Sequence, residues 1–437
     1  MNAFLEECRM RQRAGDLPGA ASPEVREARE RAMRYCLQTG LPTRRMESWR
    51  HTAGKMDCTP DPPRLVVGEA EPADADPDRD LVAMDRRQAH RMVFVNGRFA
   101  PELCDWHGLP DGVWLTGTAR VADARPELLT PWLDPEPDGE ERGFAALNQA
   151  LWRDGAFVHF APGVQLQKPL HLLFLATPGQ EQRFLAPRSM VFLEEGARAR
   201  VIESYASSGG NGHFTDAFTT LVLGRDANLE HLLLLNESGS ARHVGGMRVV
   251  QRGGSRLESR LVALGGAVTR QEVEVVLTEA HAECEQEGVL WARGRQHMDF
   301  QTRMLHNADW TRSRQRFQGV LEDAGQGVLH GLVRIPPGLR RIRAEQSIAT
   351  LLLSDAARMD AQPCLEILSD AVECHHGASV GCLDAEALFY LTSRGLTPER
   401  ARQLLIRGFV EEMVQRVRPV SVRDWLMSNL ERARRSP

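Results

Sequence analysis

The stretch LEEGARARV, residues 193–201, carries the pattern that decides the fold of this chain. An apolar strand end is followed by two polar residues, a pair of small or turn residues, and then an alternation of side chains. The pattern returns from Leu223, Val250, Leu277, Leu321 and Leu353, at intervals of 30, 27, 27, 44 and 32 residues. Such an interval suits one coil of a stacked β structure, in which neighbouring coils bury a core that no single coil could bury.

The segments between these turns are strand-like, as in LHLLFLA, FTTLVLGRD and QEVEVVLTEA. Alternation alone leaves two arrangements open, because a β-sandwich shows it as well as a β-helix. We place this region at residues 146–383 and call it the β core. A helical domain with short strands is expected at 1–145, and its residues 60–80, rich in Pro, Asp and Ala, are predicted to be an exposed linker.

After about residue 383 the period of the apolar side chains changes to that of a helix. Residues 384–393 end before Gly395, and a second helix begins after the Thr397-Pro398 pair, which is typical of a helix start. Leu405, Phe409, Met413 and Val417 give this second helix an apolar face, with Val410 beside them. A last helix is predicted from Val422 to Arg435, so residues 384–437 form a C-terminal helical domain.

The composition restricts the classes of partner. The chain has 437 residues, is 42% hydrophobic and carries a net charge of -5, so it can build a sizeable core and has no general attraction for nucleic acid or anionic lipid. No apolar run approaches the roughly 18 residues of a membrane span. The N-terminus has acidic residues where a secretory signal has basic ones. We expect a soluble cytoplasmic protein without nucleic-acid or membrane binding.

The two lysines, Lys55 and Lys168, exclude two kinds of chemistry. Neither is followed by Ser or Thr after a glycine-rich run, so the chain has no P-loop for ATP. Neither has a motif that supports a Schiff base with pyridoxal phosphate. Any ATP-driven or desulfurase step is therefore expected to belong to a partner.

The densest cluster of reactive side chains is Glu373-Cys374-His375-His376. Thiolate and imidazole are ligands that suit iron, zinc or copper(I). In a strand, Cys374 and His376 point to one face and His375 to the other, so the first two could share a metal ion or cluster. Two ligands do not close a site, and the rest would come from elsewhere in the fold or from another chain. The alternative is a pair of packed residues beside a glycine turn.

The other polar candidates give weaker signals. The eight cysteines form no C-x-x-C pair, and we expect them to be reduced. The histidines, which include His213, His231 and His243, form no compact H-x-H of the kind that a cupin iron site uses. Asp299, His306 and Asp309 lie near one another in a turn-rich stretch, where solvated polar groups are the ordinary expectation. Arg312, Arg314 and Arg316 alternate on one strand and are interpreted as a solvated face.

Four stretches together resemble the SufB/SufD family of iron–sulfur cluster assembly proteins, and their sequence motifs are those of its SufD branch. Residues 371–405, AVECHHGASVGCLDAEALFYLTSRGLTPERARQLL, are similar to the family's C-x-H-G-A-x-V-G signature and the F-Y-L-x-S-R-G helix after it. GLPTRRMESWRHT at 40–52 is similar to the family's N-terminal motif. Residues 306–323 and 344–367 are similar to its late β coils. The matches span the chain in the family's order.

The resemblance implies a right-handed parallel β-helix between N-terminal and C-terminal helical domains, which decides against the sandwich. It also implies a non-catalytic scaffold subunit that pairs with a SufB-like paralogue and a SufC-like ATPase, and that receives sulfur indirectly from a cysteine desulfurase system. ATP would be used only by the partner. A transient iron–sulfur cluster would form at the subunit interface, with His376 and then Cys374 as candidate ligands. The C-terminal helices would dock the ATPase.

Three positions depart from the family wording: His51 replaces Tyr, His375 replaces Ser, and Cys364 replaces Glu. The resemblance therefore carries no role to these positions. Two rival hypotheses stay open, a stand-alone metal-dependent enzyme with a β-helix or cupin-like fold and a purely structural interaction scaffold. Cluster type, the partner's ligands, a flavin and a homodimer are also left open.

Overall fold

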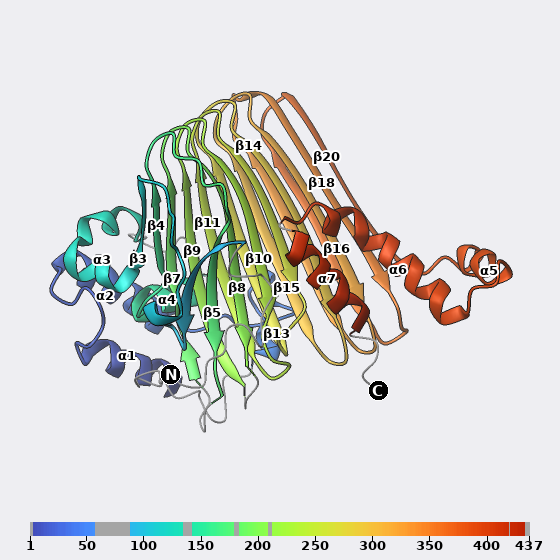
Figure 1. The fold of residues 1–437 in the computed structure, drawn as a ribbon, viewed down its shortest axis with the longest axis horizontal. Helices are drawn as coiled ribbons and strands as arrows, with labels where there is room; N and C mark the ends of the chain where they lie inside the picture. Colours follow the sequence, from blue (N-terminus) through green and yellow to red (C-terminus); the bar gives the residue numbers. More distant parts are fainter. Residues whose placement is uncertain are drawn as a thin grey trace.

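The core of the molecule is a parallel β-helix formed by two facing ten-stranded sheets (Figure 1). The computed structural model describes residues 3–56, 88–133, 142–178, 183–208, 212–418 and 420–432. The expected linker at 60–80 lies outside the described residues. Sheet A contains β3 (Val113–Gly117), β4 (Ala156–Phe160), β6 (Arg183–Leu185), β7 (Arg188–Leu193), β9 (His213–Leu223), β11 (Arg242–Gln251), β13 (Val268–Leu277), β15 (His297–His306), β17 (Gln326–Ile335) and β19 (Arg358–Ile367).

Sheet B contains β2 (Arg98–Phe99), β1 (His90–Val95), β5 (Leu170–Ala176), β8 (Arg198–Ser207), β10 (Asn228–Asn236), β12 (Arg256–Ala263), β14 (Glu283–Ala292), β16 (Arg312–Leu321), β18 (Arg340–Leu352) and β20 (Ala371–Cys382). From β7 onward the chain alternates between the sheets, and each strand pairs in parallel with the strand two places later. The prediction of a parallel β-helix is therefore confirmed, and the sandwich, which joins mostly antiparallel strands, is wrong.

The irregular spacing of the turn pattern has a simple structural cause. The starts at Leu193, Leu223, Val250 and Leu277 lie where the chain passes from sheet A to sheet B. The starts at Leu321 and Leu353 lie at the opposite rim, where the chain passes from sheet B to sheet A. The interval of 44 residues therefore spans one and a half coils. Residues with positive φ close both kinds of turn, such as Gly254 at 67° and Asp323 at 52°.

Alternate side chains of both sheets meet inside the β-helix and form one continuous apolar core. Leu229, Leu257 and Phe317 contribute from sheet B, and Val275 and Phe300 contribute from sheet A. Each is at most 3% exposed. Burial of a side chain of this size stabilises the fold by roughly 1.5–3 kcal/mol, so the stacked coils supply most of the stability of the molecule.

The N-terminal helices cover the outer face of sheet A. They are α1 (Ala3–Arg13), α2 (Pro23–Thr39), α3 (Thr118–Ala124) and α4 (Gly143–Leu151). Ser22 caps α2, and Gly40 ends it with a φ of 74°. Asn96-Gly97, a dipeptide typical of hairpin turns, connects β1 and β2. β1 and β3 precede residue 146 but pair with β5 and β4, and the boundaries at 145 and 383 stay predictions.

The C-terminal helices are α5 (Ala385–Ser393), α6 (Pro398–Gln415) and α7 (Val420–Arg432). The side chain of Thr397 accepts a hydrogen bond from the backbone N–H of Arg400, which confirms the predicted start of α6. α6 and α7 lie on the outer face of sheet B, while α5 extends beyond it (Figure 1). Val410, Met413 and Val417 of the predicted apolar face are buried. Leu405 and Phe409 are only half-buried, and Ile406 and Val414 complete the buried seam.

The helices of the described residues do not meet the requirements of a membrane span. Within the described ranges, none is both long enough and apolar enough to cross a bilayer.

Candidate functional site

β20 is the last strand of sheet B and holds the two candidate ligands. It pairs only with β18, so its second edge has no neighbouring strand among the described residues. Its residues are exposed or half-buried throughout, unlike the buried strands in the middle of the β-helix. A long edge strand offers unpaired N–H and C=O groups to another chain. β20 therefore combines reactive side chains with a backbone that is ready to pair.

Cys374 and His376 lie on the inner face of β20, the face that continues the interior of the β-helix. Cys374 packs against the core, and it is in register with the buried Ala344 of β18. His376 is in register with Gln346, which is 3% exposed. Because side chains in register on parallel strands point to the same side, His376 faces the open end of the interior. The structure thus places both predicted residues on one face.

The outer face of the same strand carries different chemistry. His375 and Glu373 alternate with the two candidates and point away from the interior. Glu373 forms an ion pair with Arg343 at 2.8 Å, and both side chains are more than half exposed. His375 is therefore separated from the Cys374–His376 pair by the strand itself, as predicted.

Cys374 is present as a thiol rather than a thiolate in the single chain. Burial raises its pKa, and a hydrogen bond with the backbone of Ala344 only partly offsets this effect. A metal ion would have to displace the proton, because the thiolate is the form that ligates. Within the described ranges, no group of three or more His, Cys, Asp or Glu side chains is arranged to hold a metal ion. The pair on β20 therefore supplies at most part of a ligand set.

The scattered histidines of the sequence form a buried cluster that was not foreseen. Glu237, in the turn after β10, accepts hydrogen bonds from His213 at 2.7 Å, from Thr215 at 2.7 Å and from His243 at 2.8 Å. Burial alone would raise the pKa of Glu237, but the charges and hydrogen bonds of His243 and His213 outweigh it and lower the pKa. Both histidines use a ring nitrogen for the carboxylate, so the cluster is a hydrogen-bonded unit rather than an open metal site.

Asp299 and His306 are also buried, so the expectation of solvated groups is wrong for both. Arg270 forms an ion pair with Asp299, and its guanidinium lies 3.8 Å from the ring centre of Trp49. His306 hydrogen-bonds Thr311 at 2.7 Å and Ser313 at 2.9 Å. Asp299 is buried because the segment around Trp49 covers the outer face of sheet A, whereas His306 points into the interior like Phe300 and Met304. The local sequence reveals neither.

The arginines of β16 form the expected polar outer face. Arg312, Arg314 and Arg316 each form an ion pair with a glutamate at 3.0 to 3.4 Å. Glu412 of α6 is the partner of Arg316, so this face also helps to hold the C-terminal helices.

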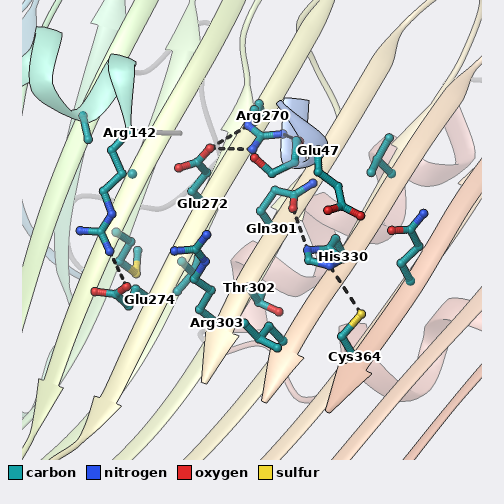
Figure 2. A pocket seen from close by; sticks show the side chains of 18 of the residues that line it. Glu47, Arg142, Arg270, Glu272, Glu274, Gln301, Thr302, Arg303, His330 and Cys364 are labelled. Carbon is teal, nitrogen blue, oxygen red and sulfur yellow. Dashed lines mark hydrogen bonds and ion pairs between the residues drawn. The ribbon is translucent and has the colours of Figure 1, made fainter. Parts of the chain in front are cut away.

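A pocket of about 360 Å³ lies on the outer face of sheet A, beside the segment 47–51 (Figure 2). Figure 2 shows two ion pairs along one wall, Arg142–Glu274 at 2.6 Å and Arg270–Glu272 at 2.7 Å. At the other wall, the Sγ atom of Cys364 lies 3.7 Å from Nε2 of His330.

Neither member of the Cys364–His330 pair is activated. Burial lowers the pKa of His330, and burial together with Glu47 and Glu366 raises the pKa of Cys364. A neutral imidazole beside a neutral thiol does not make a strong nucleophile. His51 lines the same pocket and pairs with Asp360 at 3.1 Å, so two of the three departures from the family wording share this pocket.

α5 carries a second exposed feature. Phe389 is 75% exposed and Tyr390 is 57% exposed, on a helix that extends away from the β-helix (Figure 1). Large apolar side chains are rarely left in water on a projecting element unless another surface covers them. The local sequence predicted the helix but not the exposure of these two rings.

The sequence was compared with family models and with curated proteins. The model described as SUF system FeS cluster assembly, SufBD core domain, matches residues 174–409, and the model described as SufBD protein N-terminal region matches residues 10–172. Together they include the β-helix and most of the helices.

Three relatives are named as iron–sulfur cluster assembly proteins. A SufBD family protein of Synechocystis is 30% identical over 340 residues, which are 76% of this chain and 75% of the relative. SufD of Escherichia coli is 28% identical over 403 residues, 91% of this chain and 90% of the relative. SufD of Bacillus subtilis is 28% identical over 295 residues, 67% of each chain.

Proposed function

This chain belongs to the SufBD family of iron–sulfur cluster assembly proteins as a SufD-type member, and we propose that it is a non-catalytic scaffold subunit of the assembly complex. It pairs with a SufB-like chain and a SufC-like ATPase, and His376 contributes a ligand for iron or the nascent cluster at the interface. The cluster is the cargo of this site rather than a resident cofactor.

The observation that carries the proposal is the arrangement of β20. Its inner face brings Cys374 and His376 together at the open end of the β-helix, and its outer edge has no neighbouring strand among the described residues. A partner strand added along this edge would bury both side chains and could supply the missing ligands. Imidazole and thiolate suit iron, and an incomplete set on each chain would make cluster formation depend on assembly.

The exposed rings of α5 support a separate contact with the ATPase. Phe389 and Tyr390 offer an apolar surface of the kind that a helix places in a groove. ATP hydrolysis in that partner would move the helical domain and expose or close the interface at β20. Substitution of both rings by serine is expected to release the ATPase from the complex in a pull-down, while the β20 contact persists.

The test of the proposed role is anaerobic purification of the complex from its native cell, followed by partner identification and analysis of iron and sulfide. His376→Ala is expected to lower the cluster content several-fold without loss of either partner. His375→Ala is the matched control, because that side chain lies on the opposite face of the same strand. Equal cluster content in the His376→Ala and wild-type complexes would contradict the proposal.

The two rival functions predict different results. A stand-alone metal enzyme would retain its metal when purified alone and turn over without a partner, but the described residues offer no closed ligand set that favours it. A purely structural scaffold would assemble normally and keep its cluster content after substitution of His376 or Cys374.

A further inference from the structure

A row of polar side chains crosses the apolar interior of sheet B and leads to His376. The inward positions of successive strands are in register along this row. From β10 to β20 its members are His231, Ser259, Gln286, Gln315, Gln346 and His376. The inward rows on either side of it hold mainly apolar residues, such as Leu257 and Phe317. A polar row in this setting is costly unless its groups are paired.

The three glutamines of the row are hydrogen-bonded in one direction. Nε2 of Gln315 donates to Oε1 of Gln286 at 2.8 Å, and Nε2 of Gln346 donates to Oε1 of Gln315 at 3.0 Å. Gln286 and Gln315 therefore each point the carbonyl oxygen toward the following coil. Successive amide hydrogen bonds of one orientation polarise each other, which strengthens the last acceptor of the row.

The row ends in an acceptor that has no partner. Gln286 and Gln346 are at most 3% exposed, and in the described part of the chain Nε2 of Gln286 and Oε1 of Gln346 make no hydrogen bond. A buried carbonyl without a donor is destabilising, so the open acceptor of Gln346 favours any donor that can reach it. The direction of the row places this acceptor toward β20.

His376 is the inward residue next to this acceptor. It is in register with Gln346 on the neighbouring strand, as Gln346 is with Gln315. Neighbouring strands lie about 4.8 Å apart, a distance that the Gln346–Gln315 pair already bridges. Across the interior, a Cβ atom at position 331 would clash with Nε2 of Gln346. Glycine at this position therefore leaves space for the amide.

We propose that Gln346 is a positioning residue for His376 at the interface site. When a partner covers β20, one ring N–H of His376 donates to Oε1 of Gln346, which fixes the tautomer and leaves the other nitrogen free to bind iron. This inference rests on the proposed function and deepens it. Histidine ligands in proteins commonly donate their second nitrogen to a carbonyl or carboxylate in this way, and loss of that bond typically costs 10–100-fold in metal affinity.

The experiment measures anaerobic binding of Co(II), as a substitute for iron, to the cluster-free assembled complex. Gln346→Met keeps the size of the side chain and removes the acceptor, and it is expected to weaken binding at the His376 site by about 10–100-fold. Gln346→Glu keeps an acceptor, because the amides of Gln315 and Gln286 can turn over to donate toward it, and is expected to retain binding. Gln286→Met removes a hydrogen bond of the same kind from the same row but leaves Gln346 in place, so it is the matched control.

The outcomes separate the inference from the proposed function. Weak binding by Gln346→Met, with normal binding by Gln286→Met and Gln346→Glu, supports the inference. A distance of about 3 Å from a ring nitrogen of His376 to Oε1 of Gln346 in a map of the complex supports it as well. Equal losses in Gln346→Met and Gln286→Met, or no loss in either, overturn the positioning role. Undiminished Co(II) binding in His376→Ala overturns the proposed function itself.

Discussion

The two ends of the β-helix are built from the same kind of coil but differ in their exposure to solvent. Every residue of β1, beside the N-terminal end of sheet B, is buried, and Phe99 and Trp106 stack over the adjacent core. In β20 most residues are exposed, although the strand pairs with β18 along its whole length. Stacked repeats need a cap at each end. The difference indicates that the N-terminal end is covered by residues of the chain itself, while the C-terminal end is suited to a cap from another chain.

Polar groups follow the same division. At the covered face of sheet A, Arg270 and Asp299 are paired with at most 1% exposure. At the open end, Arg343 and Glu373 make an ion pair that is largely in water. Removal of one buried partner leaves a charge without compensation, whereas an exposed pair contributes little. The energetic importance of an ion pair should therefore depend on whether it lies on the covered face or at the open end.

The largest effect is expected at the covered face. Asp299→Ala leaves the buried guanidinium of Arg270 with Glu272 as its remaining ion-pair partner and removes an acceptor from Thr52. We expect the free energy of unfolding to fall by about 3–5 kcal/mol, measured from the urea midpoint of the isolated chain. A loss below about 1 kcal/mol would show that ion pairs on the covered face and at the open end do not differ in this way.

An intermediate effect is expected from pH. Burial lowers the pKa of His306 from its ordinary value of 6.5 to about 4, so the unfolded chain takes up this proton before the folded one does. The contribution to stability is present above pH 6.5 and is lost as the pH falls toward 4, which amounts to about 2 kcal/mol between pH 7 and pH 5. Urea unfolding at both pH values should show a loss that is about 2 kcal/mol larger in the wild type than in His306→Gln, which keeps the other buried histidines such as His171. A parallel loss in both would assign the pH dependence to other groups.

The smallest effect is expected at the open end. Glu373→Ala breaks the ion pair with Arg343, but both side chains are largely solvated. The free energy of unfolding should change by no more than about 1 kcal/mol, and less at high salt. The same urea measurement, at two salt concentrations, checks this. A loss as large as that of Asp299→Ala would mean that the open end contributes to the stability of the single chain.

Much of the fold was predictable because its signals are local. The turn pattern and the start of α6 at Thr397-Pro398 appear where the sequence indicates them. The common face of Cys374 and His376 follows from the two-residue period of a strand. The resemblance to the SufB/SufD family supplied the parallel arrangement, which alternation alone had left open.

The row that leads to His376 has a signature in the sequence, which is the recurrence of polar residues once per coil. Gln286, Gln315, Gln346 and His376 follow each other at 29, 31 and 30 residues, the length of one coil. The 44-residue interval between two turn patterns concealed this period, because the pattern occurs at both rims. His213 and His243 are also 30 residues apart, but no spacing in the sequence indicates that Glu237 lies between them.

By itself, the sequence determined which segments become strands and helices, where they turn, and which side chains share a face. These properties depend on steric limits and periodicities within a few residues of the chain. Only the tertiary structure decided the register of the coils, the burial of Asp299 beneath the segment around Trp49, and the exposure of His376 beside the open acceptor of Gln346. These depend on contacts between residues one coil or more apart, whose energies come from burial and pairing that no local pattern records.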